Sequence, residues 1–191
     1  SSALLLGRME RTLIHAAAVA TPDGRAWLVV GDGGAGKSTT AIGLSTAEYR
    51  LLSDDQVVLG QADNRITVEG WLRPLHVDEG WGTGVPTGQR RTVHPSDLGL
   101  SCFQDVGTVV GTLHTRVAAE RPTAVSPIPA TEAFAGLVRQ SPWLLADRGA
   151  AESVATVLSE TARLPRYAVS LGLDTYGRGP KLRAVLDSIL A

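Results

Sequence analysis

The chain has 191 residues, 43% apolar and 19% charged, which is the composition of a globular protein with a real core and not of a disordered chain. Its formal net charge of -1 lacks the concentrated positive charge that duplex nucleic acid or an anionic membrane favours, so we expect neither as the main partner. The single cysteine, Cys102, cannot form an internal disulfide, which favours a reducing, cytoplasmic compartment. No apolar run reaches the roughly 18 residues of a membrane-spanning helix.

The first third of the chain predicts the order strand, strand, glycine loop, helix, strand. These elements are expected at Leu13 to Ala20, Ala26 to Val30, Gly31 to Ser38 (the loop), Ser38 to Leu44 (the helix) and Arg50 to Ser53. The turn-forming run Thr21-Pro22-Asp23-Gly24 joins the first two strands. This stretch therefore has the organisation of a phosphate-binding loop unit.

The rest of the chain predicts further strands and helices without repeats or low-complexity linkers. The expected elements are two hairpin strands (Gln56 to Leu59 and Ile66 to Glu69), a β-branched central strand (Val106 to Val117), a helix (Thr131 to Gln140, with Thr131 as a possible N-cap), a helix (Ala150 to Arg163), a strand (Tyr167 to Leu173) and a closing helix (Pro180 to Ala191). The Gly- and Pro-rich stretch from Gly70 to Ser101 fits none of these patterns and is a candidate substrate loop. We expect one mixed α/β domain over residues 1–191.

The loop Gly31-Asp32-Gly33-Gly34-Ala35-Gly36-Lys37-Ser38 matches the pattern G-x-x-x-x-G-K-[ST] in full. Its glycines allow positive φ and close backbone approach, so that successive N–H groups can meet phosphate oxygens beside the positive end of a helix. Lys37 would reach the β- and γ-phosphates, and the Ser38 hydroxyl suits Mg2+. We therefore expect residues 31 to 38, with Thr39, to bind ATP or GTP with Mg2+. A glycine-rich turn that matches by accident is the alternative.

Two adjacent carboxylates, Asp54 and Asp55, follow the strand after the helix. That strand brings the chain back to the sheet edge where the loop lies. Phosphoryl transfer needs a carboxylate near the γ-phosphate, either to hold Mg2+ or to accept the proton of an attacking hydroxyl. Asp54 and Asp55 are the candidates, with a solvated turn as the alternative. His15, on the strand expected to pair with the loop's own strand, is a core histidine or a third member of this site.

Three runs in this order resemble the catalytic domain of HPr kinase/phosphorylase and its HPr kinase-like relatives, in which a strand histidine, a P-loop and an Asp-Asp pair recur. The runs are Ile14-His15-Ala16-Ala17-Ala18-Val19, Val29 to Ser38, and Tyr49-Arg50-Leu51-Leu52-Ser53-Asp54-Asp55. The resemblance implies a P-loop mixed sheet related to phosphoenolpyruvate carboxykinase. The family's downstream Glu-x-Arg-Gly signature has no match here, and Asp78-Glu79 and Arg90-Arg91 are only positional substitutes for it and for the family's capping arginine.

By position, the resemblance also implies roles for individual residues. Lys37 and Ser38 would bind ATP and Mg2+, Asp54 would activate an acceptor serine hydroxyl, and Asp55 and His15 would assist, with Asp55 as a second Mg2+ ligand. The implied partner is a peptide or protein that carries the acceptor serine, and a homo-oligomer is expected from the same resemblance. The chain is similar in length to the stand-alone kinases of peptide-tailoring clusters, including lasso-peptide systems.

Two other functions are compatible with the same residues. A small-molecule P-loop kinase would also place acids after the loop helix, but it predicts a lid rich in arginine, and the sequence shows no such cluster. A nucleotide-binding module without phosphoryl transfer would explain the missing downstream signature. His76, His94 and His114 have no metal-ligand spacing and are expected to be structural or surface residues.

Overall fold

The structure is a computed structural model, and it describes residues 11–71, 73–100, 106–145 and 148–190. Cys102 lies outside these ranges. The strands are β1 (Arg11–Ile14), β2 (Ala17–Ala20), β3 (Arg25–Val30), β4 (Arg50–Ser53), β5 (Val57–Ala62), β6 (Arg65–Gly70), β7 (Leu75–Asp78), β8 (Arg90–Val93), β9 (Val106–Val117), β10 (Ala124–Pro127) and β11 (Arg166–Leu171). The helices are α2 (Lys37–Ser45), α3 (Ala130–Arg139), α4 (Arg148–Arg163) and α5 (Gly179–Leu190), with short 3-10 turns at Trp81–Thr83, Pro95–Leu98 and Pro142–Leu145.

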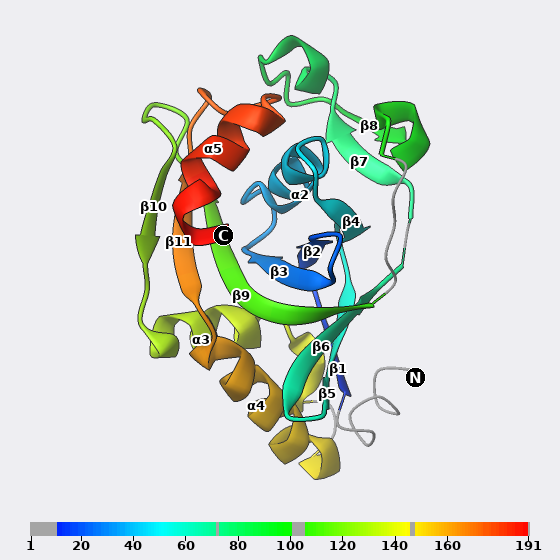
Figure 1. The fold of residues 1–191 in the computed structure, drawn as a ribbon, viewed down its shortest axis with the longest axis vertical. Helices are drawn as coiled ribbons and strands as arrows, with labels where there is room; N and C mark the ends of the chain where they lie inside the picture. Colours follow the sequence, from blue (N-terminus) through cyan, green and yellow to red (C-terminus); the bar gives the residue numbers. More distant parts are fainter. Residues whose placement is uncertain (1–10, 72, 101–105, 146–147, 191) are drawn as a thin grey trace.

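Nine of the described strands form one curled mixed sheet around β9 (Figure 1). The order β1-β5-β6-β9-β3-β2-β4 is extended by β11, which pairs with β9, and by β10, which pairs with β11. The β-branched residues that predict a central strand are confirmed in that place: β9 pairs with β6 near its start, with β3 through its middle and with β11 near its end. The long strand thus joins three parts of the sheet.

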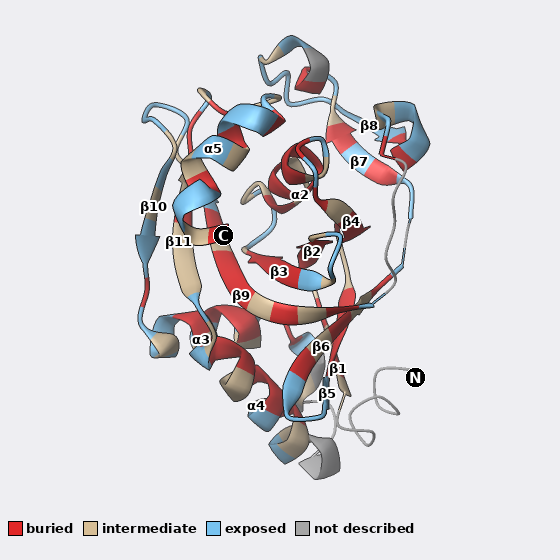
Figure 2. Ribbon diagram, in the orientation of Figure 1, coloured by how far each residue is buried: buried red, intermediate tan, exposed pale blue. Residues whose placement is uncertain are grey.

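Helices cover both faces of the central sheet, α2 and α5 on one side and α3 and α4 on the other (Figure 1). Along β3, Leu28 and Val30 pack into the apolar cluster that includes α3 and α4, whereas Trp27 and Val29 pack into the cluster that includes α2 and α5. After the exposed Arg25, every residue of β3 is buried (Figure 2), which agrees with the continuous apolar run from Ala26 to Val30. No helix among the described residues is long and apolar enough to cross a membrane.

The strand predicted from Leu13 to Ala20 is wrong, because the chain breaks into two strands at His15. β1 pairs with β5, whereas β2 pairs with β3 and β4. The His15 backbone N–H leaves the ladder and donates to the Gln140 carbonyl oxygen at 2.8 Å. The bend therefore removes His15 from the middle of a strand and places it in a turn at the edge of the sheet.

The stretch that the sequence patterns leave unassigned forms a separate two-stranded sheet, β7 and β8, in which Asp78 lies opposite Arg90. The connection between these strands is held by the Asp78 carboxylate, which accepts hydrogen bonds from the backbone N–H groups of Gly80, Thr87 and Gly88. These bonds, the one from the Thr87 N–H most of all, lower the pKa of Asp78.

The prediction that Thr131 is the N-cap of helix α3 is wrong. The helix begins at Ala130, with Pro129 at the N-cap position and Thr131 inside the first turn.

Candidate active site

The glycine loop leaves β3 and turns directly into α2, which begins at Lys37. Gly34 and Gly36 have φ values of 78° and 89°, a backbone conformation that residues with a Cβ atom rarely adopt. At Gly31, a Cβ atom would lie 2.8 Å from the Thr115 carbonyl oxygen, so the loop also packs closely against the end of β9. The glycines that the pattern requires are thus used for backbone conformation and for close packing.

Lys37 is buried at the base of the loop, with 6% of its surface exposed. Its Nζ donates to the backbone carbonyl oxygens of Gly31 at 2.8 Å and Asp32 at 3.2 Å. Burial lowers the pKa of Lys37, and the negative charges of Asp55 and Asp32 oppose that shift. Two loop carbonyl oxygens therefore hold the ammonium group in place. The nearby carboxylates do not fully offset the cost of burying its positive charge.

The two aspartates lie beside the loop because β3 and β4 are both antiparallel to β2 and so end at the same edge of the sheet. Asp54 is 7% exposed, and the Ser38 Oγ lies 3.5 Å from its backbone oxygen. Burial raises the pKa of Asp54, and the like charge of Asp55 adds to the shift. Asp55 is about half exposed, and its Oδ1 lies 3.2 Å from the Nε2 of His15.

One cavity of 730 Å³ brings the loop, the two aspartates and His15 together. Its lining includes the predicted site residues His15, Gly33, Gly34, Ala35, Gly36, Lys37, Ser38, Thr39, Asp54 and Asp55. The break after β1 is what turns His15 toward the aspartates, although the sequence pattern places it on a strand. A cavity of this size is typical of a site for a small molecule or cofactor.

Two members of the predicted loop set, Gly31 and Asp32, do not line this cavity. They line a second cavity of 520 Å³ that also contains His114, Arg139 and Gln140. There the Asp32 Oδ1 accepts a hydrogen bond from Gln140 Nε2 at 3.0 Å, and Arg139 Nε lies 4.0 Å away. The structure therefore directs the Asp32 carboxylate away from the cavity that the rest of the loop lines.

The cavity also contains residues that the sequence patterns did not place in the site. Arg73, His76 and Arg90 line the cavity from β7, β8 and the chain just before them, and we call this the β7-β8 wall. Arg90 has no ion-pair partner within the described ranges, and its charge is among the causes that lower the pKa of Lys37. The expectation that His76 is only a structural or surface residue is therefore incomplete. The one sequence signal for this wall is the Arg90-Arg91 pair.

Thr40 is a further residue of the cavity that the sequence patterns did not single out. It is fully buried in α2, and its Oγ1 has no hydrogen-bond partner among the residues that the structure describes. A buried hydroxyl without a partner costs about 1–3 kcal/mol. Because the Thr40 hydroxyl is shielded even from water, it is a local cost of the helix and not a contact point for an occupant.

The donor atoms near Ser38 fit a magnesium ion. Carboxylate and hydroxyl oxygens are the ligands that Mg2+ takes in proteins, and it usually keeps several waters and substrate phosphate oxygens as well. Burial and the negative charge of the adjacent Asp55 raise the pKa of Asp54, so a nearby cation would stabilise its ionised form. No group of three or more His, Cys, Asp or Glu residues that could enclose a metal occurs in the described ranges. The residues present suit a metal held jointly with phosphates.

Comparisons with known proteins add little to this geometry. No protein-family model matches the chain, and no curated protein matches it. One solved structure that matches is that of the Hpr(Ser) kinase/phosphatase from Coxiella burnetii, at 16% sequence identity. The match covers 61% of this chain and 71% of that chain, with a TM-score of 0.41. A likeness at this level does not bear on function, which must be argued from the cavity itself.

Proposed function

We propose that the chain binds a magnesium nucleoside triphosphate, ATP or GTP, and transfers its γ-phosphoryl group to a serine hydroxyl of a peptide or protein. The observation that carries the proposal is the convergence of Lys37, Ser38 and the Asp54-Asp55 pair on one cavity. The loop offers donors and positive charge for phosphates, and the aspartates offer a proton acceptor beside them. Phosphoryl transfer depends mainly on such positioning and charge.

In the proposed reaction the triphosphate lies on residues 33 to 39, with its β- and γ-oxygens against Lys37 Nζ. Ser38 and Asp55 would hold Mg2+, which supplies charge neutralisation to the phosphate oxygens. The serine oxygen forms a bond to the γ-phosphorus while the Asp54 carboxylate accepts the proton of that hydroxyl. The bond between the γ-phosphorus and the oxygen that bridges it to the β-phosphate breaks. The nucleoside diphosphate leaves with the electron pair of the broken bond. The raised pKa of Asp54 makes it a better proton acceptor than an ordinary exposed aspartate.

His15 and Arg90 have supporting roles in this proposal. His15 Nε2, 3.2 Å from Asp55 Oδ1, would orient that carboxylate toward the metal. Arg90 lines the same cavity from β8 and would stabilise the negative charge of the phosphoryl group during transfer, as a cation placed beside the transferred group does in many kinases.

A small anionic metabolite is a second candidate acceptor, because one observation favours it. The sequence gives no arginine-rich lid, yet the β7 and β8 region brings both Arg73 and Arg90 to the cavity. Two guanidinium groups could bind the carboxylate or phosphate of a small acceptor. Phosphoproduct formed from metabolites and not from any serine peptide would favour this candidate.

The test is transfer of label from γ-labelled ATP in the presence of Mg2+ to a library of serine-containing peptides, with the matching alanine peptides as blanks. The Asp54→Asn variant should lose transfer by about 100-fold or more, as expected for removal of a general base. Asp63→Asn makes the same chemical change in an exposed hairpin turn and should be fully active. Transfer that survives in Asp54→Asn would reject the proposed base.

A further inference from the structure

The cavity has two chemically different ends. His15, Asp54 and Asp55 form a polar end on the β4 side of the loop, whereas the β9 and β11 side, next to Gly36, is lined by apolar side chains. These are Val117, Leu171, Leu173 and Leu182. We refer to these four residues as the apolar wall.

The apolar wall leaves two large side chains open to the cavity. Val117, at the end of β9, is 56% exposed, and Leu173, just after β11, is 45% exposed. Five large apolar residues are exposed among the described residues, and two of them, Val117 and Leu173, line the same cavity. Leu171, in contrast, is buried and packs so closely on the loop that a Cβ atom at Gly36 would overlap its Cδ1. The wall is therefore continuous with the phosphate loop.

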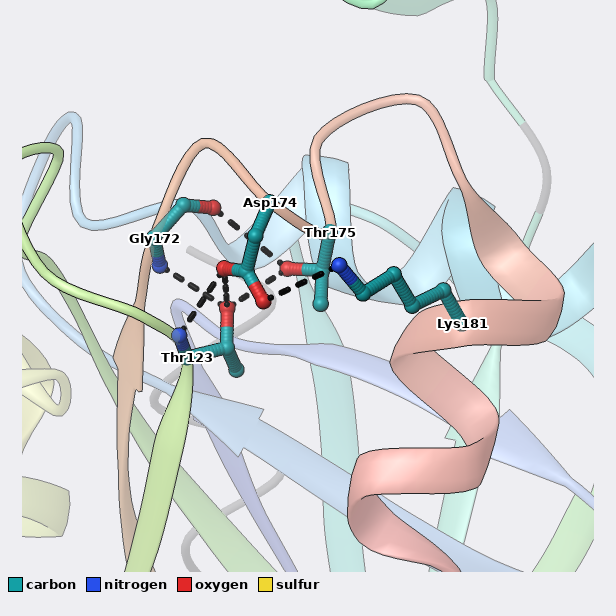
Figure 3. Close-up of polar contacts among 5 residues, drawn as sticks. All are labelled: Thr123, Gly172, Asp174, Thr175 and Lys181. Atoms are coloured by element: carbon teal, nitrogen blue, oxygen red, sulfur yellow. Dashed lines mark hydrogen bonds and ion pairs between the residues drawn. The ribbon is translucent and has the colours of Figure 1, made fainter.

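A polar network fixes the two segments that present this wall (Figure 3). The Asp174 carboxylate accepts hydrogen bonds from the backbone N–H and the Oγ1 of Thr123, both at 2.9 Å, and Lys181 Nζ lies 3.5 Å from it. Thr123 Oγ1 also accepts from the Gly172 N–H at 2.9 Å and lies 2.7 Å from Thr175 Oγ1. The segment after β9 is thus joined to the turn between β11 and α5.

The same network satisfies the Asp174 carboxylate of the turn. Burial opposes the shift, but the hydrogen bonds from Thr123 and the charge of Lys181 outweigh it and lower the pKa of Asp174. Because the carboxylate already has these partners, the turn presents Leu173, with the uncharged Thr175 and Tyr176, and no free charge to the cavity. An occupant of this end is therefore held mainly by contact with Val117 and Leu173.

We propose that the base and ribose of the bound nucleotide lie on the apolar wall, with the ring packed between Val117 and Leu173. This inference rests on the proposed function, in which the γ-phosphate faces Asp54. A triphosphate that runs across the loop in this direction puts its nucleoside end beside Gly36, where the wall begins. Planar rings have large apolar faces, and their burial against aliphatic side chains is favourable. The opposite orientation would place an uncharged ring among the aspartates and Arg90 and leave exposed apolar surface uncovered.

The test compares ATP with inorganic tripolyphosphate, both with Mg2+, by isothermal calorimetry. Tripolyphosphate can occupy the loop but has nothing to place on the wall. The unmodified protein should bind ATP about 10-fold more tightly or better. Val117→Thr keeps the side-chain shape and removes apolar surface, and Leu173→Asn does the same at the second position. Each should weaken ATP binding by about 3- to 10-fold and leave tripolyphosphate binding unchanged.

Val106→Thr is the matched control, because Val106 is 45% exposed at the other end of the same strand and is absent from the cavity lining. It should bind both ligands as the unmodified protein does. Thermal unfolding identifies any variant that fails to fold, and Val117→Thr decides the question if Leu173→Asn does not fold.

The outcomes separate the two proposals. No binding of either ligand by the folded protein would reject the proposed function itself. Equal affinity for ATP and tripolyphosphate, or an equal loss for both ligands in Val117→Thr, would overturn the base site while leaving phosphate binding in place. Weaker binding of a serine peptide in the wall variants, with no loss of ATP affinity, would assign this surface to the acceptor and overturn the inference as well.

Discussion

Gln140 connects the phosphate loop to the break between β1 and β2 that contains His15. Its side-chain Nε2 donates to Asp32 Oδ1 at 3.0 Å, and its backbone oxygen accepts the His15 N–H at 2.8 Å. Gln140 is 6% exposed and stands at the end of α3, so it is held in place by the helix on one side of the sheet. One residue outside the cavity therefore fixes the relative position of two segments that line it.

Replacement of Gln140 by glutamate should weaken nucleotide binding without removing the proposed base. The change removes a donor and places a carboxylate against the Asp32 carboxylate, while the backbone bond to His15 is kept. A buried group left without its partner costs about 1–3 kcal/mol, so we expect ATP affinity to fall by about 5- to 100-fold if the loop moves. Calorimetry with MgATP measures the change.

The control and the rescue for this variant are both available in the chain. Gln61→Glu makes the same change at an exposed position of β5 and should have no effect. Asp32→Asn combined with Gln140→Glu reverses the donor and acceptor and should restore most of the lost affinity. An unchanged affinity in Gln140→Glu alone would show that the loop does not depend on this bond.

The loop glycines should differ sharply in their tolerance of alanine. Gly36 has φ of 89°, and a Cβ atom there would overlap Leu171 Cδ1, whereas a Cβ atom at Gly33 would meet nothing within 4 Å. Gly36→Ala should therefore lower the free energy of unfolding by about 1–3 kcal/mol. Gly33→Ala, which has neither a positive φ nor a steric conflict, should unfold within about 0.5 kcal/mol of the unmodified protein. Chemical denaturation of both variants measures the difference, and equal stabilities would contradict the loop conformation described here.

The sequence predicts the parts of the fold that depend on local pattern. The loop has its own signature, and the apolar run from Ala26 to Val30 and the β-branched run from Val106 to Val117 are long enough to identify strands at the centre of the sheet. The break at His15 is not readable in this way, because the residues from Leu13 to Ala20 are apolar on both sides of it and only the choice of partner strands separates β1 from β2. β10 is also missed, since it is four residues long, lies at the sheet edge and ends in Pro127.

The candidate site likewise contains residues that local sequence patterns predict and residues that only the tertiary structure brings to it. Lys37, Ser38 and the aspartates come from a contiguous loop, helix and strand, so their spacing alone predicts that they meet. Arg90 and Val117 reach the cavity through long-range pairing, β8 with β7 and β9 with β11, which no local pattern contains. The direction of the Asp32 side chain likewise depends on Gln140, far along the chain.

Asp54→Asn should make the metal-free protein more stable while removing activity. Burial raises the pKa of Asp54 above its value in the unfolded chain, so the cost of folding with this carboxylate grows as the pH rises above the unfolded pKa and is complete above the folded pKa. Neutral asparagine avoids that cost, and we expect a gain on the order of 1 kcal/mol near pH 7, or about 2–4 °C in Tm. Thermal unfolding in the presence of a chelator measures it, with Asp63→Asn as the exposed control. A loss of stability in Asp54→Asn would mean that the carboxylate makes a favourable contact that outweighs its burial.

His114 should make the protein less stable as the solution becomes acidic. Burial, with a contribution from Arg139, lowers the pKa of His114 to about 4, compared with 6.5 for a free histidine. The unfolded chain therefore takes up a proton below about pH 6.5 that the folded protein does not take up until about pH 4, so this part of the stability is present above pH 6.5 and is lost as the pH falls toward 4. The full loss is about 3 kcal/mol. His114→Asn should reduce the slope of unfolding free energy against pH in this window, and His94→Asn, at an exposed position, should not. Parallel slopes for all three proteins in urea unfolding between pH 7 and pH 4.5 would show that His114 takes up its proton as readily in the folded protein as in the unfolded chain. That result would conflict with its position against Gly136 and beside Arg139.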